Sequence, residues 1–144
     1  MVGRLLDKNA EKEIVEAIRQ AEFATSGEIR VHVKKGVTKD VMAAAKKIFL
    51  KNKMHLTRER NGIIIYISWK SREFAVFGDE GIYHAAGDFF WNETCHKMKE
   101  YFAKNELKEG IVEAVKFVGE KLKRHFPSRP DDLNELPDKI TEEQ

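Results

Sequence analysis

Carboxylate and amide side chains cluster beside the ends of three predicted β-strands. They belong to the segments Ser-Gly-Glu at 26–28, Arg-Asn-Gly at 60–62 and Gly-Asp-Glu-Gly at 78–81, with Asp88 shortly after. If the first two strands run parallel and the second and third form a hairpin, the three segments meet at one edge of the sheet. Carboxylate and amide oxygens are the ligands that Ca²⁺ and Mg²⁺ prefer. The sequence therefore predicts a calcium or magnesium site formed by Glu28, Asn61, Asp79, Glu80 and Asp88.

Each of these residues also has a local explanation. Asn-Gly and Gly-Asp pairs are common turn chemistry, and Asp88 is able to cap a helix. Glu28 could instead form an ion pair with Arg58 or Arg60. What favours a site is the convergence of three polar segments that lie far apart in the sequence. At the level of sequence, both interpretations remain open.

Hydrophobic periodicity predicts the elements that would position these residues. Helices are expected over 9–24, 39–52, from 91 or 92 to 104, and over 107–124; strands over 28–35, 63–68 and 72–77; and a short helix or turn over 82–86. Asn9 and Thr38 are the expected caps of the first two helices. The strand at 28–35 alternates strictly and is predicted to be half-buried, whereas Ile-Ile-Ile-Tyr-Ile-Ser at 63–68 is apolar on both faces and predicts a central strand.

This order of elements predicts an α/β fold, a three-layer α/β/α sandwich with a small mixed central sheet and helices on both faces. The β-α-β unit should cross over right-handed. The fold is expected to occupy residues 1–126. Residues 127–144 contain all three prolines, and six acidic residues against two basic ones, so an acidic and loose tail is expected there.

Composition narrows the function classes. The chain has 144 residues, a net charge of +2 and a single cysteine, Cys95, which excludes an internal disulfide and a cysteine-based zinc site. The N-terminal segment lacks the apolar run of a signal peptide, and no window approaches the ~18 apolar residues of a membrane span. A soluble, cytoplasmic protein is therefore expected. Basic residues are interleaved with acids along the predicted helices, so a nucleic-acid partner is not expected.

Other reactive side chains give weaker signals. His84 lies between Asp79 and Asp88 in the sequence and is the histidine expected nearest the sheet edge, where it could serve as a general acid. Cys95 and His96 are neighbours on a predicted helix and point apart, so they do not form a nucleophilic dyad. The sequence contains neither a P-loop nor a dinucleotide-binding glycine motif.

Four segments together resemble the TPM domain family. They are Ala-Glu-Phe-Ala-Thr-Ser-Gly-Glu-Ile-Arg from 21, Thr-Arg-Glu-Arg-Asn-Gly from 57, Phe-Gly-Asp-Glu-Gly-Ile from 77 and Arg-His-Phe-Pro from 124. The resemblance covers about residues 9–127 and implies an α/β/α sandwich, divalent-metal binding, calcium in particular, and an acid-phosphatase activity. By match to these motifs it carries the metal-site role to Glu28, Asn61, Asp79 and Glu80, whereas Asp88 is added from the predicted geometry alone.

Two functional hypotheses follow. In the first, a bound metal polarises a phosphoryl oxygen and activates a water, while Arg58 or Arg60 holds the phosphate. The sequence offers no convincing nucleophile, so no catalytic residue is assigned. In the second, the domain is a non-catalytic adaptor or assembly module, in which the metal is structural and a protein partner docks at the sheet edge or on the acidic tail.

Overall fold

The computed structural model describes residues 5–87, 89–128 and 140–144, with the backbone only at 89–91. In chain order the elements are α1 (Lys8–Phe23), β1 (Glu28–Lys34), α2 (Val41–Lys51), the short 3₁₀ helix η1 (Met54–Leu56), β2 (Gly62–Ser68), β3 (Glu73–Gly78), α3 (Glu80–Ala86), α4 (Phe89–Ala103), α5 (Leu107–His125) and β4 (Ile140–Glu143). Every element predicted before residue 126 is present within a few residues of its expected bounds.

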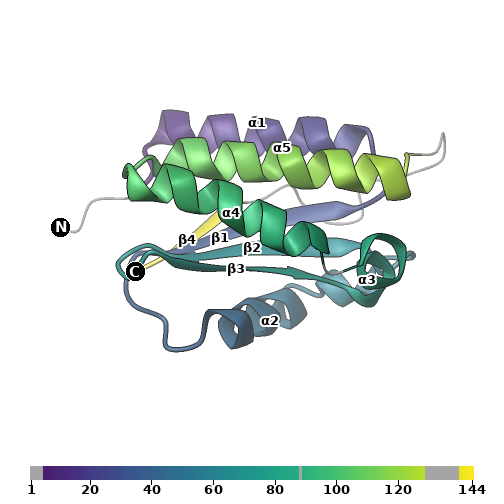
Figure 1. Ribbon diagram of the computed structural model, residues 1–144, viewed down its shortest axis with the longest axis horizontal. Coiled ribbons are helices and arrows are strands. Elements are labelled where there is room, and N and C mark those ends of the chain that lie inside the picture. Colours follow the sequence, from purple (N-terminus) through teal and green to yellow (C-terminus); the bar gives the residue numbers. More distant parts are fainter. Residues whose placement is uncertain (1–4, 88, 129–139) are drawn as a thin grey trace.

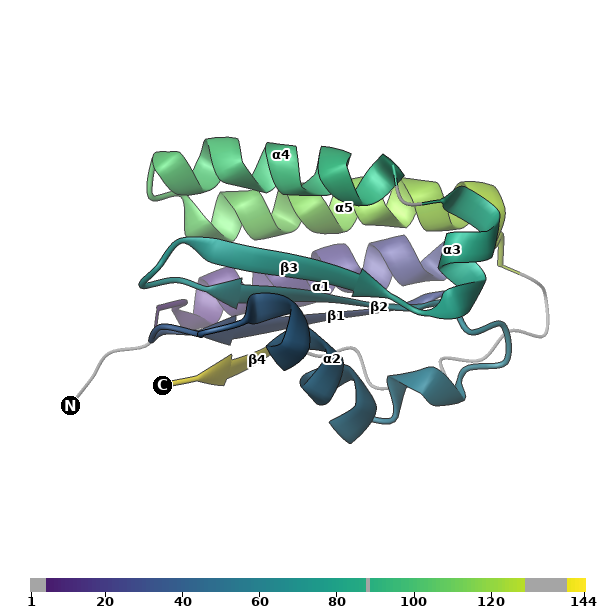
Figure 2. The ribbon, with the colours of Figure 1, turned by 60° about the horizontal axis from the view of Figure 1, so that its bottom comes forward.

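The elements form the predicted three layers around a four-stranded mixed sheet. The strand order is β3-β2-β1-β4, with β1 parallel to both β2 and β4, and β3 antiparallel to β2. Helices α1, α4 and α5 cover one face of the sheet, and α2 covers the other (Figures 1 and 2). The predicted α/β sandwich is therefore confirmed.

Two hydrophobic clusters, one on each face of the sheet, form the core. Ile63, Ile65 and Ile67 of β2 join the larger cluster under α1, α4 and α5. Ile64 and Tyr66 of the same strand join the smaller cluster under α2. All residues of β2 are buried, which confirms that its continuous apolar run marks a strand covered on both faces.

The prediction that β1 is half-buried is wrong. Arg30 and His32, on the face expected to meet solvent, are only 9% and 7% exposed. The His32 ring stacks on Tyr66 with ring centroids 5.4 Å apart, and its nitrogens lie 2.7 Å from Thr141 Oγ1 and 3.0 Å from Glu143 Oε1. His32 is thus buried by specific partners and is not solvated.

The expectation of a loose tail over 127–144 is wrong for its final segment. Residues Ile140–Glu143 form β4, which pairs with β1 in parallel from Val31 to Lys34. The physical reason is charge and hydrogen bonding: acidic and hydroxyl side chains of β4 contact the basic face of β1, so a segment with little hydrophobicity still finds a partner. The expected looseness of residues 129–139 lies outside the described residues.

Attachment of β4 is expected to weaken in acid. The hydrogen bond to His32 is the largest cause that lowers the pKa of Glu143 from its ordinary value of 4.5, and attraction to Lys34 and Lys51 adds to it. A carboxyl whose pKa is lowered by folding stabilises the fold above its unfolded pKa, and this stabilisation is lost as pH falls through the folded value. The Lys35 amide, which donates to Glu143 O at 2.8 Å, should therefore lose protection from hydrogen exchange below a pH of 4.5.

The matched variant for this prediction is Glu143→Gln, which keeps the side-chain length and removes the charge. We expect it to flatten the pH dependence of Lys35 protection. A wild-type protection factor that stays constant into the acid range would contradict the prediction.

The first two helices begin with different caps from those expected. Asp7 caps α1, its carboxylate accepting from the Ala10 N–H at 2.7 Å, and Asp40 caps α2 in the same way. Thr38 is buried, and its hydroxyl lies 2.9 Å from the Tyr66 hydroxyl. Asp and Thr are both good caps, so the sequence alone did not decide between Thr38 and Asp40 for α2. The contact of Thr38 with Tyr66 leaves the capping position to Asp40.

Candidate functional site

The register of the sheet brings the three predicted polar segments to one edge, beside α3 in Figure 1. Glu28 pairs with Gly62 across the parallel strands, and Asp79, one residue past β3, donates its N–H to Gly62 O at 3.0 Å. Glu28, Gly62 and Asp79 therefore stand in one row across three strands. We call residues 26–28, 59–62 and 79–80 the polar edge.

An ion pair between Arg60 and Asp79 lies at the centre of the polar edge. Arg60 donates from Nε to Asp79 Oδ2 at 2.7 Å and from Nη2 to Asp79 Oδ1 at 2.9 Å. Its third nitrogen, Nη1, lies 3.3 Å from Glu80 Oε1. Such two-pronged bonds between a guanidinium and a carboxylate are among the stronger hydrogen bonds in proteins. The hydrogen bond to Asp79 raises the pKa of Arg60, so the guanidinium keeps its positive charge.

The backbone around this pair fixes the two partners. Arg60 adopts a left-handed conformation with φ of 52°, and its carbonyl accepts from the Gly81 N–H at 2.9 Å. Asp79 is the N-cap of α3, and its Oδ1 also accepts from the Glu80 N–H at 2.8 Å. A Cβ at Gly81 would clash with the carbonyl oxygens of Glu59 and Arg60, the latter at 2.6 Å, so the loop and α3 meet backbone to backbone.

Asn61 is held by a chain of polar contacts and leaves one oxygen without a partner. Its Nδ2 donates to Ser26 Oγ at 3.0 Å, Ser26 in turn donates to Glu59, and the Asn61 N–H donates to Thr57 Oγ1 at 3.2 Å. Asn61 is 1% exposed, and its Oδ1 is buried without a hydrogen-bond donor among the described residues. An unpartnered buried acceptor is costly, so this oxygen is a position where a cation or water would bind favourably.

The other predicted site residues differ in their surroundings. Glu28 is 4% exposed, and its N–H donates to Asn61 O at 3.4 Å. Glu80, in the first turn of α3, is exposed. Asp88 lies outside the described residues. His84 lies in the last turn of α3, is exposed, and belongs to none of the contacts just described.

The polar edge does not contain a ready-made carboxylate cage. Within the described ranges, no group of three or more His, Cys, Asp or Glu side chains is placed to hold a metal ion. Asp79 instead forms an ion pair with Arg60, and Asn61 contributes a buried oxygen that has no hydrogen-bond donor among the described residues. The sequence did not single out Glu59 or the Arg60–Asp79 pair. Glu59 stands inside the motif that carries the family resemblance, and this was the signal that could have identified it.

Comparisons with known proteins place the chain in a family. The model of the TPM domain matches residues 3–121. The chain belongs to the TPM domain family. It is 37% identical to the BA42 protein of the psychrophilic bacterium Bizionia argentinensis, whose NMR structure superposes with a TM-score of 0.91 over 99% of this chain and 98% of BA42.

A second solved structure shares the fold of this TPM domain. It is the N-terminal domain of a protein from P. gingivalis, 17% identical, with a TM-score of 0.69 over 87% of this chain and 83% of that one. No curated protein matches the sequence. No helix of the TPM domain within the described residues is long and apolar enough to cross a membrane.

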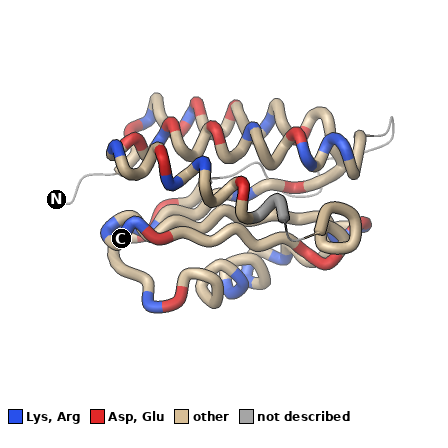
Figure 3. Tube along the Cα trace, in the orientation of Figure 1, with Lys and Arg blue, Asp and Glu red and all other residues tan. Residues whose placement is uncertain are grey.

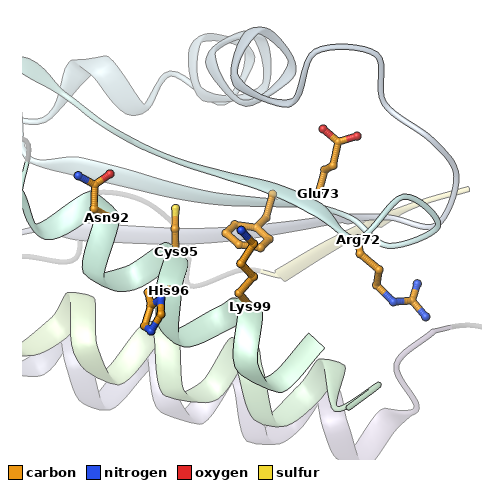
Figure 4. Close-up of a pocket in the computed structure, with 7 residues that line it drawn as sticks. Arg72, Glu73, Asn92, Cys95, His96 and Lys99 are labelled. Carbon is orange, nitrogen blue, oxygen red and sulfur yellow. The ribbon is translucent and has the colours of Figure 1, made fainter. Parts of the chain in front are cut away.

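A groove between β3 and α4 is lined by several reactive side chains (Figure 4). It has a volume of about 430 Å³ and is lined by Arg72, Glu73, Phe74, Asn92, Cys95, His96 and Lys99. Cys95 and His96 point in different directions from α4, which agrees with the prediction that they form no dyad. Burial raises the pKa of the Cys95 thiol, which disfavours the reactive thiolate.

Arg72, at the other side of the groove, already has partners: its guanidinium lies over the Trp69 ring and donates to Asn105 Oδ1 at 2.8 Å. The groove thus lacks an activated nucleophile among these lining residues.

Proposed function

We propose that this TPM domain binds a divalent cation, Ca²⁺ or Mg²⁺, at the polar edge. The observation that supports this most directly is the buried, unpartnered Oδ1 of Asn61, which lies in the same edge segment as the Arg60–Asp79 pair. Glu28, Asn61, Asp79 and Glu80 are the proposed ligands, and Asp88 remains a proposed ligand from the sequence. All of them offer the hard oxygen atoms that these cations select.

The Arg60–Asp79 pair is compatible with this proposal because it already shows a cation bound to the carboxylate. A metal at the polar edge would take the place of the guanidinium on Asp79. The Arg60 side chain is 42% exposed, so it has room to turn toward solvent when it is displaced. A bound divalent cation would supply Lewis acidity, which is the chemistry that phosphomonoester hydrolysis needs.

The alternative is a non-catalytic module in which the cation orders the polar edge for a protein partner. One observation favours it: the polar-edge side chains with reactive or phosphate-binding chemistry already have partners. The Ser26 hydroxyl is bound to Glu59 and Asn61, and the Arg60 guanidinium is bound to Asp79. We therefore propose metal binding as the shared element and weak phosphomonoester hydrolysis as a secondary activity to be tested.

A calcium titration followed by amide NMR tests the metal site, with magnesium titrated in parallel. We expect saturable shifts confined to the polar edge, and we expect Asp79→Asn to weaken binding by about tenfold or more because a ligand charge is lost. Asn still caps a helix, so α3 should persist. Asp40→Asn is the matched control, because Asp40 is also the N-cap of a helix, where it accepts from the Ala43 N–H, and it lies outside the polar edge.

Two results would reject the metal site: no shifts at millimolar metal, or equal binding by wild type and Asp79→Asn. Hydrolysis of p-nitrophenyl phosphate is measured on the same three proteins. Turnover that requires metal and disappears in Asp79→Asn alone would support catalysis at the polar edge. Turnover that persists unchanged in Asp79→Asn would come from a contaminant and would leave the adaptor alternative.

A further inference from the structure

The layer that contains α2 has a different distribution of charge on its outer surface from the layer on the other side of the sheet. Residues 34–58 contain seven lysines and one arginine against a single acid, Asp40, although the whole chain has a net charge of only +2. Along α1 and α5, basic and acidic residues alternate, and some form ion pairs, such as Glu16–Arg19 at 3.0 Å. Figure 3 shows this contrast as blue segments on α2 and mixed red and blue segments on the helices of the other layer. The expectation that basic residues are interleaved with acids is therefore wrong for α2.

Exposed apolar side chains gather in the same segment. Of the six large hydrophobic residues that are exposed in the described ranges, four lie between residues 37 and 56. Single exposed apolar residues are normal on a protein surface, but their concentration in one segment marks an interaction surface. The four are Val37, Met42, Leu50 and Leu56, which are 57%, 38%, 56% and 65% exposed.

The helix geometry places the apolar and basic side chains together. Ala45 and Phe49 are the buried residues of α2 and face the sheet. Lys46 and Lys47 precede Leu50 by four and three positions, so these three side chains share the outward side of the helix, and all are exposed. We define the α2 surface as Val37, Met42, Leu50 and Leu56 together with Lys39, Lys46, Lys47, Lys51 and Lys53.

We propose that the α2 surface docks on an anionic lipid bilayer. A helix that exposes aliphatic side chains among lysines is suited to lie in the membrane interface, where the aliphatic groups enter the acyl boundary and the ammonium groups meet lipid phosphates. The α2 surface contains no aromatic side chain for stacking on bases, which favours lipid over nucleic acid. The proposal is independent of the polar edge and of any metal.

Co-sedimentation of the full chain with vesicles tests this proposal, in the presence of a chelator so that the metal site plays no part. We expect binding to vesicles of phosphatidylcholine with phosphatidylserine and none to phosphatidylcholine alone. Lys46→Glu combined with Lys47→Glu should weaken binding by about tenfold or more, because each lysine contributes separately to attraction by anionic lipid. Leu50→Ser combined with Leu56→Ser should weaken binding by about tenfold, because both leucine side chains would no longer bury apolar surface in the membrane interface.

The matched control is Lys8→Glu combined with Lys12→Glu, two exposed lysines four residues apart on α1. It changes the net charge by the same amount, and we expect it to leave vesicle binding within about twofold. Equal losses in the α1 and α2 charge variants would overturn the proposal, because attraction would then depend on net charge. Failure to sediment with phosphatidylserine vesicles would also overturn it. The proposal would also be overturned if the protein bound duplex DNA but not vesicles, and if the leucine variant bound DNA as well as wild type does.

Discussion

Replacing Gly81 with alanine is expected to destabilise the domain by about 3 kcal/mol, near the upper end of the usual cost of overpacking. The added Cβ would clash with the Glu59 and Arg60 carbonyl oxygens, and backbone atoms cannot move aside as a flexible side chain can. The loop at 59–60 and the start of α3 would have to separate. That movement would also break the hydrogen bond from Gly81 N–H to Arg60 O. Urea unfolding followed by circular dichroism measures the loss.

Gly36→Ala is the control for this prediction. Its Cβ would have only ordinary contacts, the nearest being 3.7 Å from Gln144 O, so we expect little change in the free energy of unfolding. Amide shifts in Gly81→Ala should be largest at the polar edge, because Arg60 would no longer be positioned against Asp79. Equal stability of Gly81→Ala and wild type would mean that the loop and α3 are not in direct backbone contact.

Replacing Phe102 with alanine is expected to cost about 3–5 kcal/mol, the range for truncating a buried phenylalanine. Phe102 is 2% exposed and joins α4 to the sheet. Its ring packs edge-on against Trp69 and Phe74, with centroids 5.4 and 5.5 Å apart. Such edge-to-face pairs add to the effect of burial itself. Thermal and urea unfolding should both show the loss, together with a weaker near-ultraviolet signal from Trp69.

The matched control is Phe23→Ala, the same substitution at a ring that is 86% exposed at the end of α1. Its effect should stay within about 0.5 kcal/mol, as for most surface changes. A loss in Phe102→Ala no larger than that in Phe23→Ala would contradict the packing of α4 on β3 and the hairpin loop.

Most of the fold could be predicted because it depends on local patterns. The continuous apolar run of β2 indicated burial on both faces, and Ile14 and Ile18 on α1 follow the helical spacing that places them in the core. The convergence of the polar segments also followed from topology, since parallel β1 and β2 start at the same edge. Periodicity determines which side of an element is buried, and a single crossover then determines how the ends meet.

The contacts that the sequence did not reveal depend on pairing between distant residues. The Arg60–Asp79 bond joins residues 19 positions apart and requires Arg60 in a left-handed conformation, which no pattern of apolar residues indicates. The strand β4 contains one apolar residue, Ile140, so alternation could not identify it. Its partner His32 was predicted to face solvent because a single strand does not show which segment will cover its polar face.

The parallel pairing of β4 with β1 also has a consequence for how the chain assembles during synthesis. The contact between His32 and Thr141 spans 109 residues, so closing it requires the whole central part of the domain to be made first. Until then β1 remains an open edge, the kind of strand on which other chains tend to aggregate. Charged side chains on an edge strand oppose such pairing. Lys34, which pairs with β4 in the finished fold, is such a charged side chain on the open edge of β1, and we expect it to oppose aggregation of the nascent chain.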